Sequence, residues 1–198
     1  MEFSNPFIQR VFAHLPKLPL ADFVMSHWDA GKPTREVVGF LPIPGVDAER
    51  FMARVMDVDH YLGHIGHVEE TRSLPDPGGE PSKRVRFYQR VKIPLVGNVH
   101  HSLVMERLGT LEGYEVAAWT LLAPETAALD GKSAIRSESS DGAWLVGHGV
   151  VGYALSSVPR REDVGFLKWQ ALTKGADLAA STALRENIKG MAAWAAAS

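Results

Sequence analysis

The sequence predicts an α+β domain in which a curved antiparallel sheet of seven strands wraps around a long C-terminal helix. Three observations carry this prediction. Residues 83–94 alternate apolar and polar side chains, the period of two that is typical of a strand with one solvated face. Turn signals such as Asp141-Gly142 separate further runs of strand-forming residues. After Pro159 the chain has no proline and becomes rich in alanine, which favours a helix.

The N-terminal segment is predicted to be helical. Residues 4–15 fit a short amphipathic helix, because Pro6 suits a first turn and apolar side chains share one broad face. A second short helix is predicted over residues 20–28. We therefore divide the chain into an N-terminal helical arm, residues 1–33, and a main domain, residues 34–198. The arm either packs on the main domain or presents a helix to a partner or to a membrane surface.

The main domain is predicted to begin with one strand and two short helices. Residues 35–41 fit a strand, and residues 48–56 fit a helix with its apolar side chains on one side. A second helix is predicted over residues 57–64. The hydrophobic period then changes to that of a strand over residues 67–74. A loop rich in proline and glycine, residues 75–79, follows this strand.

Residues 83–94 give the clearest strand. Its inner face carries Val85, Phe87, Gln89, Val91 and Ile93, and its outer face is strongly cationic. The outer face is best explained as a solvated surface that nearby carboxylates balance, namely Glu69, Glu70, Asp76 and Glu106. Gln89 interrupts an apolar row, and a buried amide needs hydrogen-bond partners. Those partners are protein groups, water or a ligand.

The remaining strands are predicted over residues 99–108 and 114–122, with a last hairpin of residues 133–139 and 143–157 around Asp141-Gly142. The chain order is then one strand, two short helices, six strands and one long helix. The pattern does not determine which side chains of the later strands face the interior.

The C-terminal segment is predicted to form one helix over about residues 162–196. At about 100° per residue, the small residues Ala171, Gly175 and Ala179 fall on one stripe. Glycine in a helix costs about 1 kcal/mol relative to alanine, so Gly175 indicates a spatial requirement. The stripe either leaves room for a ligand against the sheet or lets the helix pack closely on it.

The composition excludes several functional classes. The 198 residues are 45% hydrophobic and 22% charged, as in ordinary globular proteins. The absence of cysteine excludes disulfides and thiolate chemistry, and a formal charge of −2 gives no general attraction to nucleic acid. The first residues lack the basic segment of a signal peptide, and no stretch approaches the ~18 apolar residues of a membrane span. We expect a cytoplasmic protein without integral membrane association.

Three histidines have metal-ligand spacing. His60, His64 and His67 are four and three residues apart, which would place them on one side of a helix. Gly63 and Gly66 interrupt such a helix, so we expect a solvated cluster or a pocket entrance and no metal site.

The order of elements resembles the START/Bet v 1-like superfamily, also called SRPBCC or helix-grip. The resemblance covers about residue 34 to the C-terminus and is carried by residues 38–51 (VGFLPIPGVDAERF) and 91–100 (VKIPLVGNVH). START proteins usually have an Arg-Asp pair where this chain has His100-His101. The resemblance implies a cavity between the sheet and the long helix that binds lipids, hormones or aromatic polyketides. Some members are cyclases or dehydratases.

The expected function is binding or transfer of a small hydrophobic ligand, without a cofactor, a metal or assigned catalytic residues. One alternative is a polyketide cyclase or dehydratase-like enzyme of the same fold. The other is a protein-interaction module whose cavity is filled by side chains; the oligomeric state stays open. The predicted ligand-binding residues are Val85, Phe87, Gln89, Val91, His101, Trp119, Arg136, His148, Tyr153, Ala171, Gly175 and Ala179.

Overall fold

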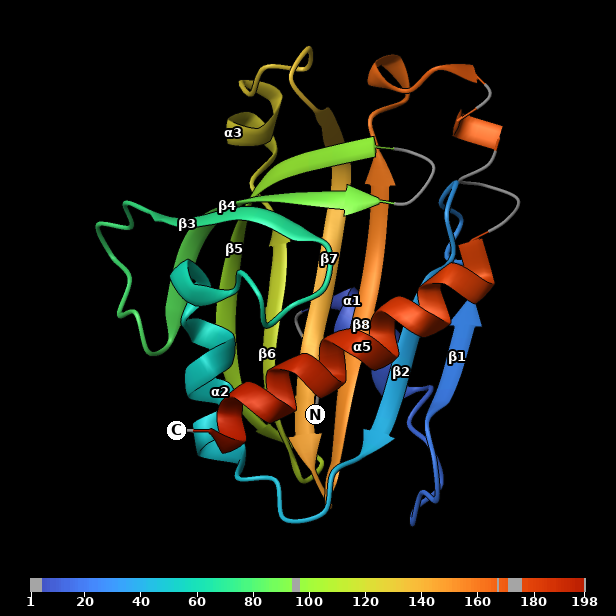
Figure 1. The fold of residues 1–198 in the computed structure, drawn as a ribbon, viewed down its shortest axis with the longest axis vertical. Helices are drawn as coiled ribbons and strands as arrows, with labels where there is room; N and C mark the ends of the chain where they lie inside the picture. The colour runs from blue at the N-terminus through green and yellow to red at the C-terminus, as the bar shows by residue number, and fades with distance from the viewer. Residues whose placement is uncertain (1–4, 94–96, 167, 171–175, 198) are drawn as a thin grey trace.

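The computed structural model describes residues 5–93, 97–166, 168–170 and 176–197. Within them, eight strands form one curved sheet in the order β1-β2-β8-β7-β6-β5-β4-β3 (Figure 1). The strands are β1 (Val24–Trp28), β2 (Glu36–Pro42), β3 (Val68–Leu74), β4 (Arg84–Ile93), β5 (Gly97–Leu111), β6 (Tyr114–Leu121), β7 (Ile135–Gly147) and β8 (Val150–Pro159). Neighbouring strands are antiparallel, and β5 also makes a short parallel pairing with β7.

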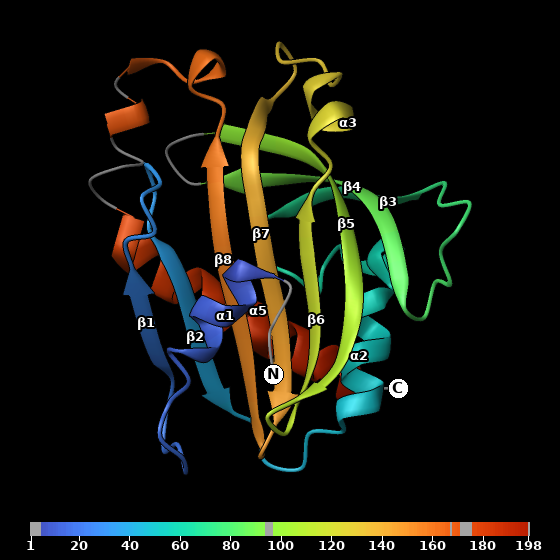
Figure 2. The same cartoon turned by 180° about the vertical axis from the view of Figure 1, so that it is seen from behind.

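Helices cover both faces of this sheet. They are α1 (Pro6–Phe12), α2 (Ala48–Met56), the 3-10 turn η1 (Val58–His60), α3 (Ala123–Ala127), the 3-10 turn η2 (Arg161–Asp163) and α5 (Ala176–Ala196). The long helix α5 crosses the inner face diagonally toward α2 in Figure 1, and Figure 2 shows α1 on the opposite face. The result is an α+β fold in which the sheet curves around its C-terminal helix, as the sequence predicts.

Two apolar cores lie on the two sides of the sheet. On the inner side, Leu184, Ile188 and Met191 of α5 are fully buried in one cluster with residues of α2 and of the strands. On the outer side, α1 buries Ile8 and Val11 against a second set of strand residues. Both cores require alternation along the strands, and this explains the period of two in the sequence.

The helix expected over residues 20–28 is wrong. Residues 24–28 form the edge strand β1, which pairs with β2 so that Met25 lies opposite Gly39. A side chain at Gly39 would overlap the ring of Phe23, so this glycine gives the preceding segment room to lie on the sheet. The sheet therefore has eight strands instead of seven, because tertiary pairing overrides a weak local helical pattern.

The hairpin turn expected at Asp141-Gly142 is also wrong. Strand β7 continues through both residues, and the turn to β8 lies at His148 and Gly149, whose φ angles are 54° and 71°. Gly142 serves another purpose, since a side chain there would overlap the ring of Trp119. An Asp-Gly pair therefore marks close packing in this strand, although it usually indicates a turn.

The two predicted helices that flank the sheet differ from expectation in length. The second short helix, expected over residues 57–64, contains only the single turn η1. The C-terminal helix does not run continuously from residue 162, because η2 is followed by extended backbone at Val164. Residues 166 and 168–170 are helical, and α5 is described from Ala176.

Candidate ligand-binding site

Strand β4 has the orientation that the sequence predicts. Val85 and Phe87 of β4 face the inner core, where they are buried beside Met105 and Leu103 of β5. Residues opposite each other on paired strands project to the same face. Gln89 therefore lies beside His101 on the inner face.

Two aromatic candidates from later strands also face this interior. Trp119 of β6 and Tyr153 of β8 are 7% and 8% exposed, and both belong to the inner core. Tyr153 stacks on Trp144 with ring centroids 4.1 Å apart. Burial raises the pKa of Tyr153, against the opposing effect of a hydrogen bond with Asn187 of α5, so its hydroxyl stays neutral. The inner face thus presents flat rings with an uncharged polar group among them.

A polar trio lies on the inner face, with one residue on each of β4, β5 and β7. His101 contacts the Oε1 atom of Gln89 through Nε2 at 3.3 Å and the hydroxyl of Ser137 through Nδ1 at 3.0 Å. A histidine protonated at Nε2 satisfies both contacts, because Nε2 donates to the amide oxygen and Nδ1 accepts from the hydroxyl. We call Gln89, His101 and Ser137 the polar trio.

The imidazole of His101 is neutral at physiological pH. Its side chain is buried, and burial together with the neighbouring His100 lowers its pKa to about 4. The strand places the two histidines on opposite faces, so His100 lies on the outer side with Tyr88. A neutral imidazole donates one hydrogen bond and accepts one without bringing charge into the interior.

The polar trio divides two apolar regions of the same face. Toward α2, Phe87 and Leu103 belong to the large inner core. In the other direction along the strands, Val91 and Val99 belong to a smaller cluster with Ile135 and Val164.

Two predicted ligand-binding residues, Arg136 and His148, lie away from the polar trio. The guanidinium of Arg136 makes two hydrogen bonds of 2.7 Å with the carboxylate of Asp163. His148 occupies the β7–β8 turn, where its ring lies against Tyr114 of the outer core. The structure does not bring either residue together with the polar trio. The sequence did not determine which face of the sheet their side chains project to, because that depends on where the turns and bulges lie.

Most of the stripe of small residues on the C-terminal helix lies outside the described residues. Ala171 and Gly175 lie outside the described residues, and Ala179 is described only as part of the helix α5. The cavity expected between this stripe and the sheet therefore stays a prediction.

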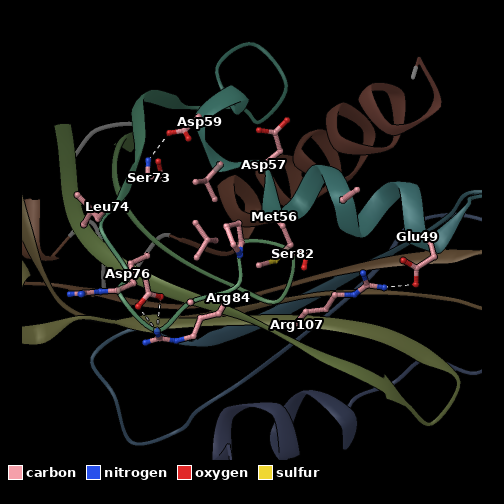
Figure 3. Close-up of a pocket in the computed structure, with 16 residues that line it drawn as sticks. Glu49, Met56, Asp57, Asp59, Ser73, Leu74, Asp76, Ser82, Arg84 and Arg107 are labelled. Carbon is pink, nitrogen blue, oxygen red and sulfur yellow. Dashed lines mark hydrogen bonds and ion pairs between the residues drawn. The ribbon is translucent and has the colours of Figure 1, made fainter.

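A different hollow is present at the α2 end of the molecule. It has a volume of about 610 Å³ and lies between α2, η1, β4 and the loop that joins β3 to β4 (Figure 3). Four of its charged lining groups form two ion pairs, Glu49–Arg107 and Asp76–Arg84. Of the predicted site residues, Val85 lines it. Paired charges suit a solvated cleft better than a site for an apolar ligand.

The histidines with metal-ligand spacing are engaged separately. His60 binds the carboxylate of Asp57 at 2.7 Å, and His64 stacks on Trp194 with centroids 4.4 Å apart. His67 has a φ of 67°, a turn conformation that would end a helix. Within the described part of the chain, no group of histidine or acidic residues has the arrangement of a metal site.

The carboxylates expected to balance the cationic face do so. Arg84 binds Asp76 and Glu106, and Arg90 lies within 3.5 Å of both Glu69 and Glu70. Arg84 and Arg90 on the outer face of β4 are therefore both paired with carboxylates.

Ser137 is the site residue that sequence reasoning missed. It follows the point where β5 and β7 pair in parallel, and the β7–β8 register shifts between Ser137 and Ser139. That bulge interrupts the alternation of the strand, so periodicity gives no signal. A serine between strand-forming residues beside Arg136 was the only hint, and it is a weak one.

Replacing Gln89 with leucine tests whether the trio supports the fold. We expect the free energy of unfolding to fall by about 1–3 kcal/mol, because the change leaves the buried Nε2 of His101 without its acceptor. Thermal melts with and without an apolar fluorescent probe would measure it. A Gln89→Leu protein that is as stable as the wild type but binds the probe less well would show that Gln89 contacts only ligand.

Neither a protein-family model nor a curated protein matches this sequence. Solved structures do resemble the fold. The STAR-related lipid transfer protein of Xanthomonas axonopodis has a TM-score of 0.66 at 14% identity, over 91% of this chain and 97% of that one. Human STARD10 has a TM-score of 0.69 at 14% identity, over 96% and 80%. The di-domain aromatase/cyclase StfQ of the steffimycin pathway has a TM-score of 0.52 at 14% identity, over 82% and 50%. No helix among the described residues is long and apolar enough to span a membrane.

Proposed function

We propose that this chain, which has the START/Bet v 1-like helix-grip fold, binds or transfers a small hydrophobic ligand between its sheet and its C-terminal helix. One observation carries the proposal: the inner face has two apolar regions separated by a neutral polar trio. Ligand sites are typically apolar surfaces with a few polar groups that fix orientation. The likeness of the fold to that of the STAR-related lipid transfer protein of Xanthomonas axonopodis supports it.

A cyclase-like enzyme is the second candidate. A neutral buried histidine is a suitable proton carrier, and the likeness to StfQ favours this alternative. Yet both ring nitrogens of His101 already contact Gln89 and Ser137, and no carboxylate among the described residues contacts them. A reaction that moves protons needs a paired acid and base, so binding is the better-supported function.

Native mass spectrometry of freshly purified protein tests the proposal. We expect a co-purified apolar molecule that is released unchanged on denaturation, and transfer of such molecules between vesicles. A chemically altered molecule after incubation would indicate the enzyme instead. Protein that carries no ligand and takes up no apolar probe would favour the interaction module with a filled interior.

A pair of substitutions on neighbouring positions of β4 locates the site. Val91 faces the smaller apolar cluster, and Lys92 is exposed. Val91→Trp should weaken binding of an apolar probe by about tenfold or more, because the indole fills space that the ligand needs. Lys92→Trp adds the same side chain to the opposite face and should leave affinity unchanged. Equal affinities for both variants, with melts like the wild type, would place the ligand elsewhere.

A further inference from the structure

The polar groups that the structure describes around the trio are uncharged. Burial and the neighbouring His100 lower the pKa of His101, and no carboxylate, lysine or arginine contributes. Thr71 of β3 lies opposite Gln89 in the strand pairing, and its uncharged hydroxyl donates a hydrogen bond to the backbone oxygen of Val58. No carboxylate, lysine or arginine among the described residues contacts the trio.

The charged residues close to His101 in the sheet are engaged on the outer face. Arg90 follows Gln89 along β4, so it projects to the other side, where it lies near Glu69 and Glu70. Arg136 lies opposite His100 in the parallel pairing and binds Asp163. These cations are turned away from the trio and already have carboxylate partners.

We infer that the ligand is an uncharged molecule whose single polar oxygen binds the trio through the side-chain amide of Gln89, because both ring nitrogens of His101 already have partners. This inference rests on the proposed function and specifies its substrate class. An alcohol, ketone, ester or phenol oxygen matches groups that can each donate or accept a hydrogen bond. A carboxylate, a phosphate or an ammonium group would be buried without an opposite charge, which is strongly unfavourable.

A matched set of probes tests the inference on the wild-type protein. The set is a pyrene-labelled hexadecanoic acid, its methyl ester, the corresponding primary alcohol and the corresponding trimethylammonium compound. At pH 8 we expect the alcohol and ester to bind and both ions to bind at least about tenfold more weakly. The affinity of the acid should rise as the pH falls toward its own pKa, while that of the alcohol stays constant down to about pH 6, where His101 is still neutral.

The outcomes separate this inference from the proposed function. Ions that bind as tightly as the alcohol at pH 8 would overturn the inference and leave hydrophobic ligand binding intact. A protein that binds none of the four probes would overturn both. Binding of the alcohol and ester alone would support both.

A positive charge placed in the trio should reverse the preference of the protein for the alcohol over the acid. Gln89→Arg introduces a cation beside His101, so binding of the acid should strengthen at least about tenfold relative to the alcohol. Arg90→Gln changes the charge by one unit on the outer face and should leave the preference as in the wild type. If Gln89→Arg fails to fold, the wild-type probe set still decides the question.

Discussion

The Gly190→Ala protein is expected to be less stable than the wild type by about 2 kcal/mol, although alanine is the better helix former by about 1 kcal/mol. Gly190 lies in α5, and a Cβ atom there would overlap the backbone carbonyl oxygen of His64. The loop cannot easily retreat. Asn187 accepts a hydrogen bond of 2.9 Å from the backbone of Gly66, and Trp194 stacks on His64. These contacts hold the loop to the helix on both sides of the glycine.

Urea unfolding of Gly190→Ala and of Ala193→Gly measures this effect. Ala193 is exposed on the same helix, so its change should cost only the propensity difference of about 1 kcal/mol. We also expect Gly190→Ala to bind an apolar probe less tightly, because α5 closes the inner face of the sheet. A Gly190→Ala protein more stable than the wild type would show that the loop yields and that helix propensity dominates.

Residues whose structure depends on local pattern were predictable. Helix α2 has the expected bounds, because Asp47 caps it by accepting a hydrogen bond from the backbone of Arg50 and its apolar side chains recur at helical spacing. The alternation in β4 oriented Gln89 correctly, since a sheet that buries one face specifies its register strongly. Both features, the bounds of α2 and the orientation of β4, depend on short runs of consecutive residues.

Features that depend on distant partners were not predictable. Gly142 resembles a turn residue until Trp119 of the neighbouring strand is known to cover it. Gly190 resembles an unfavourable helix residue until His64 is placed against it, whereas the sequence drew attention to Gly175. The partnership of His101 with Ser137 depends on the parallel contact of β5 with β7, which spans 36 residues. Local propensity carries no information about such approaches.

The largest expected dependence of stability on pH comes from Glu36, which is fully buried on β2. Its carboxylate accepts hydrogen bonds from Arg10 at 2.7 and 2.9 Å and from the indole of Trp28 at 2.8 Å, and Lys32 lies 3.1 Å away. Burial alone would raise the pKa of Glu36. The hydrogen bonds from Arg10, Lys32 and Trp28 together outweigh burial and lower this pKa from 4.5 to about 2.

A carboxyl group whose pKa is lower in the folded state stabilises the fold above its unfolded pKa. That contribution is lost as the pH falls from about 4.5 to about 2. We expect Glu36→Gln to reduce the free energy of unfolding at pH 7 by about 3 kcal/mol. The two proteins should approach each other in stability toward pH 2, because the carboxyl of Glu36 is then about half protonated in the folded protein and almost fully protonated in the unfolded one.

Urea unfolding at pH 7, 4 and 2.5 measures this convergence, with Glu186→Gln as the control. The side chain of Glu186 is 60% exposed, so its loss should change stability little at any of these pH values. Because Arg10 belongs to α1, the loss of Glu36 should also loosen that helix from the outer face, which faster proteolysis near residue 13 would report. A Glu36→Gln protein whose stability stays parallel to the wild type from pH 7 to 2.5 would show that the ion pairs do no more than offset the burial of the charge.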